Sequence, residues 1–413
     1  MNLKKVIDKK DKAAKYMIDE ITHIIKTCGK RDPGSEGEKK SCEYMAEVLK
    51  NDCGCEDVKL ESYEVAPRAF YGWIYFTITF VLISILTFFF VPIVSIPLII
   101  AGFVLVLIEF GLYKKFLDPI FKKKTSHNVT AFKKCTGETK RRIIFNGHPD
   151  ATWEWPVNYA LGGLGFEGHA IIVVVGALYY LGISIAYVAE NGIGFGMPDI
   201  SDPLVIAGLC GLVFVPFMIG LYFMVNYNRV VDGANDNLSG CYIGIAILKA
   251  LKDEGIELEN TEIGVVLTGS EEIGLRGSKA WAQAHKGEFQ DVPTFIYSYD
   301  TINDPKYLMA NYRDLNGTVK TDKDCADLFY EAAQAVNVPC KKGWIPPLGG
   351  AVDAAGFVQG GFRSAGVTGL NHKLERYYHT RLDSYDNMNK QGLANCFAAS
   401  VKMLEMFDDG AKQ

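Results

Sequence analysis

Two long apolar blocks interrupt an otherwise mixed pattern of hydrophobic and polar residues along the chain. In the first block, residues 69–113, Glu109 is the single charged residue. The second block, residues 169–225, holds two apolar runs separated by the polar stretch ENGIGFGMPDISDP. A membrane-spanning helix needs roughly 20 apolar residues, so each block is long enough for two spans. The pattern predicts four transmembrane helices in two hairpins, with the turn of the first hairpin at Pro92 to Pro97.

Positive charges lie on one side of the two predicted hairpins. The hairpin tips contain no Lys or Arg, whereas the second tip carries Glu190, Asp199 and Asp202. The basic residues near the span ends are Arg68, Lys114, Lys115, Lys122, Lys123, Lys124 and Arg229. Because such residues stay in the cytoplasm, we expect an integral membrane protein with four spans whose termini and catalytic domain are cytoplasmic. The first 16 residues contain no apolar run, so we expect no signal peptide.

Outside the hairpins, short apolar strands alternate with amphipathic helices. The expected strands are residues 128–132, 141–147, 262–269, 294–299 and 364–370. The expected helices, in which apolar residues recur every three or four positions, are residues 12–28, 37–51, 237–255, 325–338 and 392–407. This alternation predicts an α/β fold, with a mixed, mostly parallel sheet that helices cover on both faces.

The hairpins divide the chain into five segments. The two transmembrane hairpins are residues 69–113 and 169–225. Each hairpin returns the chain to the side of the membrane that it left. We therefore expect the other three segments to fold together as one domain: residues 1–68, 114–168 and 226–413.

Composition adds two limits to this interpretation. The net charge of −5 offers no basic surface for nucleic acid, so we expect no nucleic-acid partner. Ten cysteines without a signal peptide are typical of a reducing compartment. Cys53 and Cys55 have no Cys or His partner at zinc-finger spacing, and we interpret them as ordinary thiols.

Acidic residues and histidines stand at the ends of the expected strands or beside the expected helices. In chain order they are His148, Asp150, Asp236, Glu271, Glu272, Asp300 and His379. Ligand groups in open α/β sheets gather at the carboxyl ends of the strands. Two first-row divalent metals need a mixed set of nitrogen and oxygen ligands of this kind, with one carboxylate between the ions.

Each of these signals alone has an ordinary structural explanation. A histidine at a strand end is often only hydrogen-bonded, paired glutamates usually lie on a solvated face, and an Asp before a helix usually caps it. Two acids at the end of a buried strand are costly unless they are paired or bind a metal. The occurrence of all these signals in one chain favours a metal site.

The ordered motifs resemble those of the co-catalytic zinc aminopeptidases and carboxypeptidases of metallopeptidase family twenty-eight. The matching stretches are HPD (148–150), GANDNLSG (233–240), EEIGLRGS (271–278), YDTI (299–302) and YHTRLD (378–383). The early stretch RDPGSEGEKKSCEYMAEVLK is also similar to the N-terminal helix region of that family. The resemblance covers nearly all of the chain outside the hairpins and implies a zinc-exopeptidase-like fold. It does not cover the hairpins, because family members usually have only a short loop between HxD and the bridging Asp.

The resemblance implies a role for each motif residue. His148 and Asp300 would bind one zinc ion, Glu272 and His379 would bind the other, and Asp236 would bridge the two. Asp150 would orient the imidazole of His148 as its hydrogen-bond partner. Glu271 would be the general base, which takes a proton from water and passes it to the leaving amine.

Three further residues are candidates for supporting roles. The Tyr378 hydroxyl would donate a hydrogen bond to the oxyanion, with packing beside the sheet as the alternative. Asp353, in the Gly-rich stretch PLGGAVDAAGF, is a candidate for substrate binding, and a helix cap is the alternative. Asp383, four residues after His379, is a candidate for holding that imidazole.

These interpretations lead to a specific set of expected cofactors and partners. The cofactors are two Zn²⁺ ions, with Co²⁺ or Mn²⁺ as replacements. The partners are the lipid bilayer and a peptide substrate that is hydrophobic or released from the membrane, because aromatic residues such as Trp153 and Trp155 follow the HPD motif. Gly208 and Gly211 allow close helix packing and so suggest a homodimer.

Three classes of function stay open at the level of sequence. The first is a membrane-embedded zinc aminopeptidase, which hydrolyses N-terminal residues of peptides. The second is another metal-dependent enzyme on the same scaffold, either an N-acyl amino acid amidase or a glutaminyl cyclase. The third is a non-catalytic receptor-like or transporter module, which predicts missing ligands, whereas all the motif residues are present.

Overall fold

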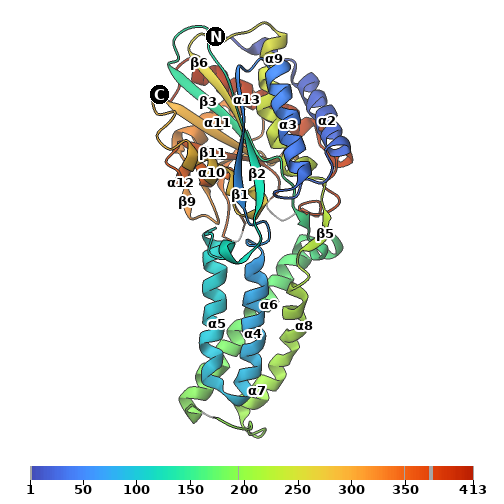
Figure 1. The fold of residues 1–413 in the computed structure, drawn as a ribbon, viewed down its shortest axis with the longest axis vertical. Helices are drawn as coiled ribbons and strands as arrows, with labels where there is room; N and C mark the ends of the chain where they lie inside the picture. The colour runs from blue at the N-terminus through green and yellow to red at the C-terminus, as the bar shows by residue number, and fades with distance from the viewer. Residues whose placement is uncertain (1, 194, 348, 372–374, 413) are drawn as a thin grey trace. The chain divides into compact units, whose positions relative to one another are not determined.

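The computed structural model describes residues 2–193, 195–347, 349–371 and 375–412, and these form two compact units (Figure 1). The first unit consists of Met1–Pro67, Lys122–Glu154 and Asn228–Gln413. The second unit consists of Arg68–Phe121 and Trp155–Tyr227. The chain therefore leaves the first unit twice and returns to it twice.

A nine-stranded sheet forms the centre of the first unit, in the order β1-β2-β6-β3-β7-β11-β8-β10, with β9 paired to β8. The strands are β1 (Asp57–Val65), β2 (Lys124–Lys133), β3 (Arg141–Gly147), β6 (Thr261–Thr268), β7 (Thr294–Ile302), β8 (Met309–Asp314), β9 (Val319–Lys320), β10 (Lys341–Trp344) and β11 (Ser364–Gly369). The four central strands β6, β3, β7 and β11 are parallel, whereas β1 and β2 add antiparallel pairs at one edge. The expected mixed α/β sheet is confirmed, and each of the five expected strands is present.

The central strands are buried on both faces. On β3, Ile143 and Phe145 belong to one core, while Ile144 between them belongs to another. Side chains alternate between the two faces of a strand, so a continuous apolar run serves both cores. The larger core includes residues of α2, α3, α9, α11 and α13, and the smaller core includes Trp281 of α10 and Phe357 of α12.

The first unit contains eight α-helices among its described residues, and those at the five predicted positions begin and end close to the expected bounds, whereas α1 and α10 were not predicted. Their bounds are α1 (Lys4–Ile7), α2 (Lys10–Thr27), α3 (Glu36–Asn51), α9 (Ser239–Asp253), α10 (Arg276–Ala284), α11 (Lys323–Ala335), α12 (Asp353–Gln359) and α13 (Lys390–Asp408). Side-chain caps fix three of the starts, because Ser35, Asp322 and Asn389 accept hydrogen bonds from backbone N–H groups in the first turn.

Four helices of the second unit are long and apolar enough to cross a membrane. They are α4 (Gly72–Phe90), α5 (Pro92–Val106) with its π-helical end, α6 (Pro156–Asn191), and the broken helix formed by α7 (Pro203–Gly211) and α8 (Val215–Leu221). The predicted turn at Pro92 to Pro97 is wrong, because α4 and α5 meet at Val91 and Pro97 lies inside α5. Pro92 is tolerated at the start of α5, where a missing N–H breaks no helical hydrogen bond.

The second unit exposes large apolar side chains and buries several hydroxyl groups among its other apolar residues. The large residues Leu178 and Val213 are 51% and 64% exposed. Ser84, Ser95 and Ser184 are fully buried. Ser95 Oγ donates to the Ser84 carbonyl oxygen at 2.7 Å, which joins α5 to α4. Transmembrane helices pack through small residues and inter-helix hydrogen bonds of this kind.

Both glycines that suggested a homodimer pack inside the second unit. A Cβ atom at Gly208 would lie 2.3 Å from the Phe88 ring, and one at Gly211 would lie 2.7 Å from the Tyr179 ring. Their lack of a side chain thus permits contacts within one chain. The homodimer expectation therefore loses the feature on which it rested.

The chain makes two excursions from the first unit, and the longer one consists of Trp155–Tyr227. A small two-stranded sheet pairs the segments at its two ends. Its strands are β4 (Trp153–Glu154), just before the chain leaves, and β5 (Asn226–Val230), where it returns. Beside them, the Val231 N–H donates to the Thr152 carbonyl at 3.0 Å. The two ends of the excursion are thus joined by backbone hydrogen bonds.

Candidate metal centre

Three neighbouring parallel strands bring their candidate residues to one edge of the sheet. His148 and Asp150 follow β3, Glu271 and Glu272 follow β6, and Asp300 lies near the end of β7. Because β6, β3 and β7 are adjacent and parallel, their carboxyl ends meet. Strand order thus explains why residues far apart in sequence become neighbours.

Asp236 and His379 reach the same place from loops. Asp236 lies in the irregular turn Ala234–Leu238, directly before α9, and its peptide bond to Asn237 is cis. His379 lies in the loop between β11 and α13. Both side chains are almost completely buried.

The carboxylate of Asp236 lies between the two histidines. Its Oδ1 is 3.3 Å from His148 Nε2, and its Oδ2 is 3.1 Å from His379 Nε2. Glu272 Oε2 is 3.2 Å from the same His379 nitrogen. Asp236, Glu272 and His379 therefore form one group of side chains that could hold a metal ion.

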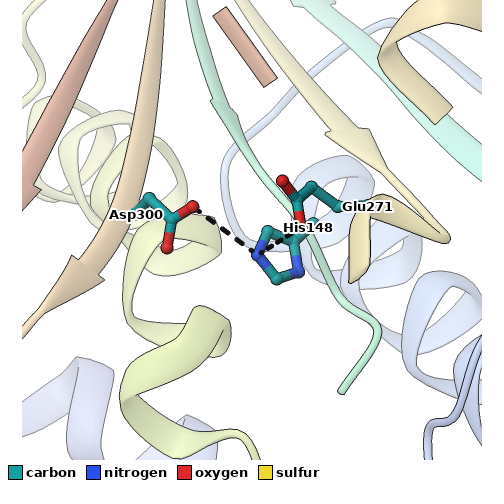
Figure 2. A group of neighbouring side chains, drawn as sticks. All are labelled: His148, Glu271 and Asp300. Carbon is teal, nitrogen blue, oxygen red and sulfur yellow. Dashed lines mark ion pairs between the residues drawn. The ribbon is translucent and has the colours of Figure 1, made fainter. Parts of the chain in front are cut away.

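A second group that could hold a metal ion consists of His148, Glu271 and Asp300. Figure 2 shows both carboxylates turned toward the same imidazole nitrogen of His148. The distances from His148 Nε2 are 3.7 Å to Glu271 and 3.9 Å to Asp300. Glu271, which the resemblance assigns as a base, thus lies as close to this position as the assigned ligand Asp300.

Asp150 connects the two glutamates to the first histidine. Its Oδ1 and Oδ2 accept hydrogen bonds from the backbone N–H groups of Glu271 and Glu272, at 3.1 Å and 3.2 Å. The same Oδ1 is 3.4 Å from His148 Nδ1. One buried carboxylate thus orients both the imidazole and the turn that carries the glutamates, whereas the sequence suggested only the first contact.

Three turns at the site contain non-glycine residues in the left-handed region of φ. They are Ser270 at +54°, Thr301 at +50° and His379 at +54°. Ser270 precedes Glu271 and Thr301 follows Asp300, so each turn carries a candidate residue. Such backbone conformations persist only where the surrounding contacts hold them, and they gather at functional sites.

Burial and mutual repulsion raise the pKa values of three carboxyl groups. Desolvation is the largest cause for Glu271, Glu272 and Asp300, and neighbouring carboxylates add to it. Burial alone would lower the pKa of His148, but Glu271, Asp150 and Asp236 outweigh this and raise it well above its usual value. Without a bound cation, protons must therefore balance the negative charge of the cluster.

Tyr378 stacks on the ring of His379. The ring centroids are 4.0 Å apart, with 14° between the planes. Burial and the nearby carboxylates, Asp236 first among them, raise the pKa of the phenol well above its usual value. The hydroxyl therefore keeps its proton at neutral pH and is able to donate a hydrogen bond.

Asp353 is buried at the end of β6, where Thr268 Oγ1 donates to its Oδ2 at 2.5 Å. Burial raises its pKa to about 6. Asp314 carries out the capping of α12, because it accepts hydrogen bonds from the N–H groups of Val352 and Ala355. The carboxylate of Asp353 is thus held from the side of β6, next to the turn that carries Glu271.

Asp383 binds the loop of the bridging residue. Its Oδ1 accepts from the backbone and side-chain nitrogens of Asn235, at 2.8 Å and 2.9 Å. Its Oδ2 accepts from the Asp236 N–H at 3.1 Å. The hydrogen bonds of Asp383 therefore hold the Asp236 loop, whereas the sequence suggested that it holds His379.

Two buried residues that sequence reasoning missed hold the loops in place. Arg31 donates to the carbonyl oxygens of Pro149 and Asp232 at 2.8 Å and 2.7 Å, so it joins the loops of His148 and Asp236. Glu38 accepts from Ser270 Oγ at 3.0 Å, behind the Glu271 turn. The one sequence signal was that both lie in the early stretch RDPGSEGE, at the start of α3.

Comparison with known proteins supports the family. Residues 222–404 match the model of peptidase family M28. A zinc aminopeptidase from Bacillus subtilis has a similar fold, with a TM-score of 0.55, 14% identity, and coverage of 95% of this chain and 94% of that chain. For an aminopeptidase from Aneurinibacillus sp. strain AM-1 the values are 0.55, 14%, 97% and 95%. No curated protein sequence matches this chain.

A glutaminyl cyclase from Porphyromonas gingivalis also shares the fold, with a TM-score of 0.51, 10% identity, and coverage of 97% of this chain and 98% of that chain. At these identities, the structural likeness concerns the fold alone. The family match covers the segment with Asp236, Glu271, Glu272, Asp300 and His379. Residues 222–404 therefore match peptidase family M28, and the chain shares its fold with zinc aminopeptidases.

Proposed function

We propose that this chain is a membrane-anchored aminopeptidase that uses two zinc ions. The observation that carries the proposal is the placement of Asp236, whose two oxygens face His148 Nε2 at 3.3 Å and His379 Nε2 at 3.1 Å. A carboxylate in this position is suited to bridge two metal ions. Asp300 completes the ligand set on the side of His148, and Glu272 does so on the side of His379.

The donor atoms fit zinc. Imidazole nitrogen and carboxylate oxygen are both common zinc ligands. Among the described residues, His148 Nε2 and Glu272 Oε1 are buried and have no hydrogen-bond partner. Buried polar atoms in this state are costly, and coordination to a metal would satisfy them.

The chain's own residues supply the proton transfers. Zinc bound here would contribute Lewis-acid chemistry, which activates water and polarises the scissile carbonyl. Glu271 lies beside His148, and burial raises its pKa, so it can take a proton from water and later give it to the leaving amine. Asp150 fixes the Glu271 backbone, and the Tyr378 hydroxyl would donate to a developing oxyanion.

Charge supports cleavage from the N-terminus. Two zinc ions would carry four positive charges and the cluster holds the five carboxylates Asp150, Asp236, Glu271, Glu272 and Asp300, so the remaining negative charge favours the positive α-amine of a peptide over a C-terminal carboxylate. Two of the proteins with a similar fold are aminopeptidases. Asp353 is the candidate residue for substrate binding, because it is buried next to the Glu271 turn.

Four apolar helices with buried hydroxyls and exposed aliphatic side chains support membrane anchoring. The distribution of Lys and Arg supports a catalytic unit on the cytoplasmic side. An enzyme anchored in this way would have direct access to peptides that are hydrophobic or released from the membrane. We therefore propose peptides of this class as its substrates.

Glutaminyl cyclase activity is the second candidate. It is favoured by the fold shared with the Porphyromonas gingivalis glutaminyl cyclase. A cyclase would also use a metal and a general acid–base residue at a peptide N-terminus. The two candidates differ in product, because a cyclase releases ammonia from an N-terminal Gln and breaks no peptide bond.

The test uses the full chain in lipid nanodiscs. Zinc is counted, and release is measured from aminoacyl-coumarins, N-acetylated aminoacyl-coumarins and a peptide with N-terminal Gln. We expect two zinc ions per chain and release from free N-termini only. Activity on blocked substrates alone would identify an amidase, and cyclisation of Gln without hydrolysis would identify a cyclase.

The general base is tested by Glu271→Gln. We expect the activity to fall by about 10²- to 10⁴-fold, because the amide cannot accept the proton. Glu64→Gln is the matched control, since Glu64 is an exposed residue of β1 that pairs only with Lys123 among the described residues. Full activity of Glu271→Gln would disprove the proposed mechanism.

The substrate class is tested with a lipidated peptide and its soluble counterpart. We expect the ratio of their kcat/KM values to be higher in nanodiscs than in detergent micelles, because a bilayer holds the lipidated peptide and the anchored enzyme in one surface, whereas excess micelles distribute them among separate particles. Equal ratios in the two media would overturn the proposed substrate class and leave the aminopeptidase proposal intact.

A further inference from the structure

An ion pair between a buried carboxylate and a partly exposed arginine lies where the chain leaves the first unit for residues 155–227. Glu154, the last residue of β4, is only 1% exposed. Its carboxylate accepts three hydrogen bonds from Arg381: from Nε at 2.6 Å, from a terminal nitrogen at 2.7 Å and from the backbone N–H at 3.2 Å. Arg229, on the returning strand β5, adds a weaker contact at 3.7 Å.

Arg381 is two residues from the candidate ligand His379. That loop holds itself together through Thr380, whose Oγ1 donates to the carbonyls of Arg376 and Tyr377. Arg381 and Asp383 connect the loop to other parts of the first unit, because Arg381 binds Glu154 and Asp383 binds Asn235 and Asp236. These partners lie on opposite sides of the excursion in sequence, so the loop joins the two flanks.

The backbone of His379 needs such support. Its φ of +54° is unfavourable for a residue with a Cβ atom and depends on the surrounding contacts. A bidentate arginine–carboxylate pair is among the stronger polar contacts and also fixes the direction of approach. Removing Arg381 would leave the buried carboxylate of Glu154 without its main partner, which favours local rearrangement of the loop.

The other candidate metal position depends on different contacts. His148 follows the central strand β3, and Asp150 and Arg31 hold its loop. Asp300 lies within β7, which pairs with β3 and β11. Loss of the Glu154–Arg381 pair should therefore affect the position at His379 and spare the position at His148.

We propose that Glu154 and Arg381 are positioning residues for His379. The pair sets where the His379 imidazole meets Asp236 and Glu272, and it does so from the point where the excursion joins the catalytic unit. The inference rests on the proposed two-metal site. It assigns a role in metal binding to residues outside the ligand set.

The test compares metal affinities in the full chain. Zinc affinity is measured for each of the two ions by competition with a chelating dye, in wild type, Arg381→Ala, Arg381→Lys and Glu154→Gln. Partners that orient metal ligands typically contribute about 10- to 100-fold in affinity. We expect Arg381→Ala and Glu154→Gln to weaken one ion by about 10-fold or more and the other by less than about 2-fold.

Arg363→Ala is the matched control. Arg363 also forms a bidentate pair, with Asp322, and its side chain is 39% exposed compared with 40% for Arg381. It lies next to β11, away from the candidate ligands, and we expect it to leave both zinc affinities unchanged. Arg381→Lys keeps the charge without the bidentate geometry, so we expect an intermediate loss.

Two further readouts separate positioning from general stability. Arg381→Ala and Arg363→Ala should shift the melting temperature of the metal-free protein similarly, while only the former changes the absorption spectrum of the cobalt-loaded protein. The double variant Glu154→Gln/Arg381→Ala should be no worse than the worse single variant, because both remove one interaction.

The outcomes distinguish the proposals. Equal weakening of both ions, unchanged affinities in Arg381→Ala, or additive losses in the double variant would overturn the positioning role while the two-metal site stands. A wild type that binds fewer than two ions would overturn the proposed function and, with it, this inference.

Discussion

The two units of this chain differ in the side chains that they expose and in the polar groups that they bury. The first unit buries aliphatic and aromatic residues on both faces of its sheet, and it concentrates buried charge at the strand ends. The second unit buries serine hydroxyls such as those of Ser84 and Ser95 beside apolar residues such as Phe88, and it exposes large aliphatic residues such as Leu178. The first arrangement suits water, because burial of apolar surface is favourable there. The second suits lipid, where apolar side chains can remain exposed.

The difference also shows how each unit can tolerate buried polar groups. In the second unit, buried hydroxyls donate to nearby carbonyls, and the buried carboxylate of Glu109 accepts from the Leu117 N–H at 2.5 Å. In the first unit, the carboxylates of Glu271, Glu272 and Asp300 repel one another. The buried polar groups of the second unit thus have hydrogen-bond donors or acceptors nearby. The clustered carboxylates of the first unit instead need cations or protons to balance their charge.

Removal of metal should therefore destabilise only the first unit, and this is the largest effect that we expect. A ligand at 100 times its Kd contributes about 2.7 kcal/mol, so the two proposed ions would together contribute about 5 kcal/mol. The metal-free protein should be more stable at pH 5 than at pH 8, because the pKa values of Glu271, Glu272 and Asp300 are raised in the folded state. As these carboxyl groups ionise with rising pH, the free energy of unfolding of the first unit decreases.

Hydrogen exchange after chelation, followed separately for peptides of each unit, measures this effect. Protection should fall in β3, β6 and β7 and stay constant in α4 and α5. Equal losses in the two units, or a metal-free form that is more stable at pH 8 than at pH 5, would contradict the comparison.

An arginine in place of an exposed leucine should have a large cost in the second unit and almost none in the first. Leu178, near the centre of α6, is 51% exposed, and Leu178→Arg should cost about 2.5–3.5 kcal/mol of membrane insertion. Leu60 on β1 is 39% exposed, and Leu60→Arg should change stability by less than about 0.5 kcal/mol. The fraction of each variant that resists carbonate extraction reports insertion, and equal fractions would show that α6 does not face lipid.

A buried acid away from the cluster should give a smaller, pH-dependent effect. Burial raises the pKa of Asp314 to about 7, although it accepts hydrogen bonds from the N–H groups of Leu315, Val352 and Ala355. A raised carboxyl pKa means that its contribution is present at low pH and is lost as pH rises toward 7. Between pH 5 and pH 6 the loss should be about 1.4 kcal/mol.

Asp314→Asn should remove this slope, because the amide does not ionise. Urea unfolding of the first unit, followed by tryptophan fluorescence at several pH values, measures the difference between wild type and variant. Parallel curves across pH 4 to 7 would show that Asp314 does not titrate in this range.

The smallest expected effect comes from a hydroxyl inside the second unit. Ser95→Ala removes the hydrogen bond to the Ser84 carbonyl and should cost about 0.6 kcal/mol. In the first unit, Ser400→Ala leaves the buried Tyr299 hydroxyl without its partner and should cost about 1–3 kcal/mol. Thermal unfolding in nanodiscs compares the two, and a larger cost for Ser95→Ala would reverse the order.

The sequence predicted the central strands because their periodicity is strong. The runs that became β3 and β6 are apolar at nearly every position, since both faces are covered. It missed β1, whose residues DVKLESYEV are mostly polar, because an edge strand with one exposed side needs little apolar surface. It also missed β8 and β10, whose short runs carry few aliphatic residues.

Most of the candidate ligands were predicted from sequence because they stand at the end of a predictable strand or helix, whereas His379 lies in a loop and was predicted from its motif. Parallel strand order then explains their meeting, as for His148 and Asp300. The supporting residues were harder to predict. Arg31 donates to backbone carbonyls of two loops that are distant in sequence, and carbonyl acceptors leave no residue-specific signal. Arg381 differs from any surface arginine only through its contact with Glu154.

The pairing of β4 with β5 has a consequence for how the inserted segment between them could change in evolution. Because the strands hold the ends of the excursion together, its length hardly affects the catalytic unit, and each doubling of a loop costs only about 0.6 kcal/mol in closure entropy. Segments of very different size and chemistry could therefore be exchanged at this one place. The helices between Trp155 and Tyr227 are in this sense an exchangeable insertion, and its exchange could add or remove a membrane anchor without changing the catalytic unit.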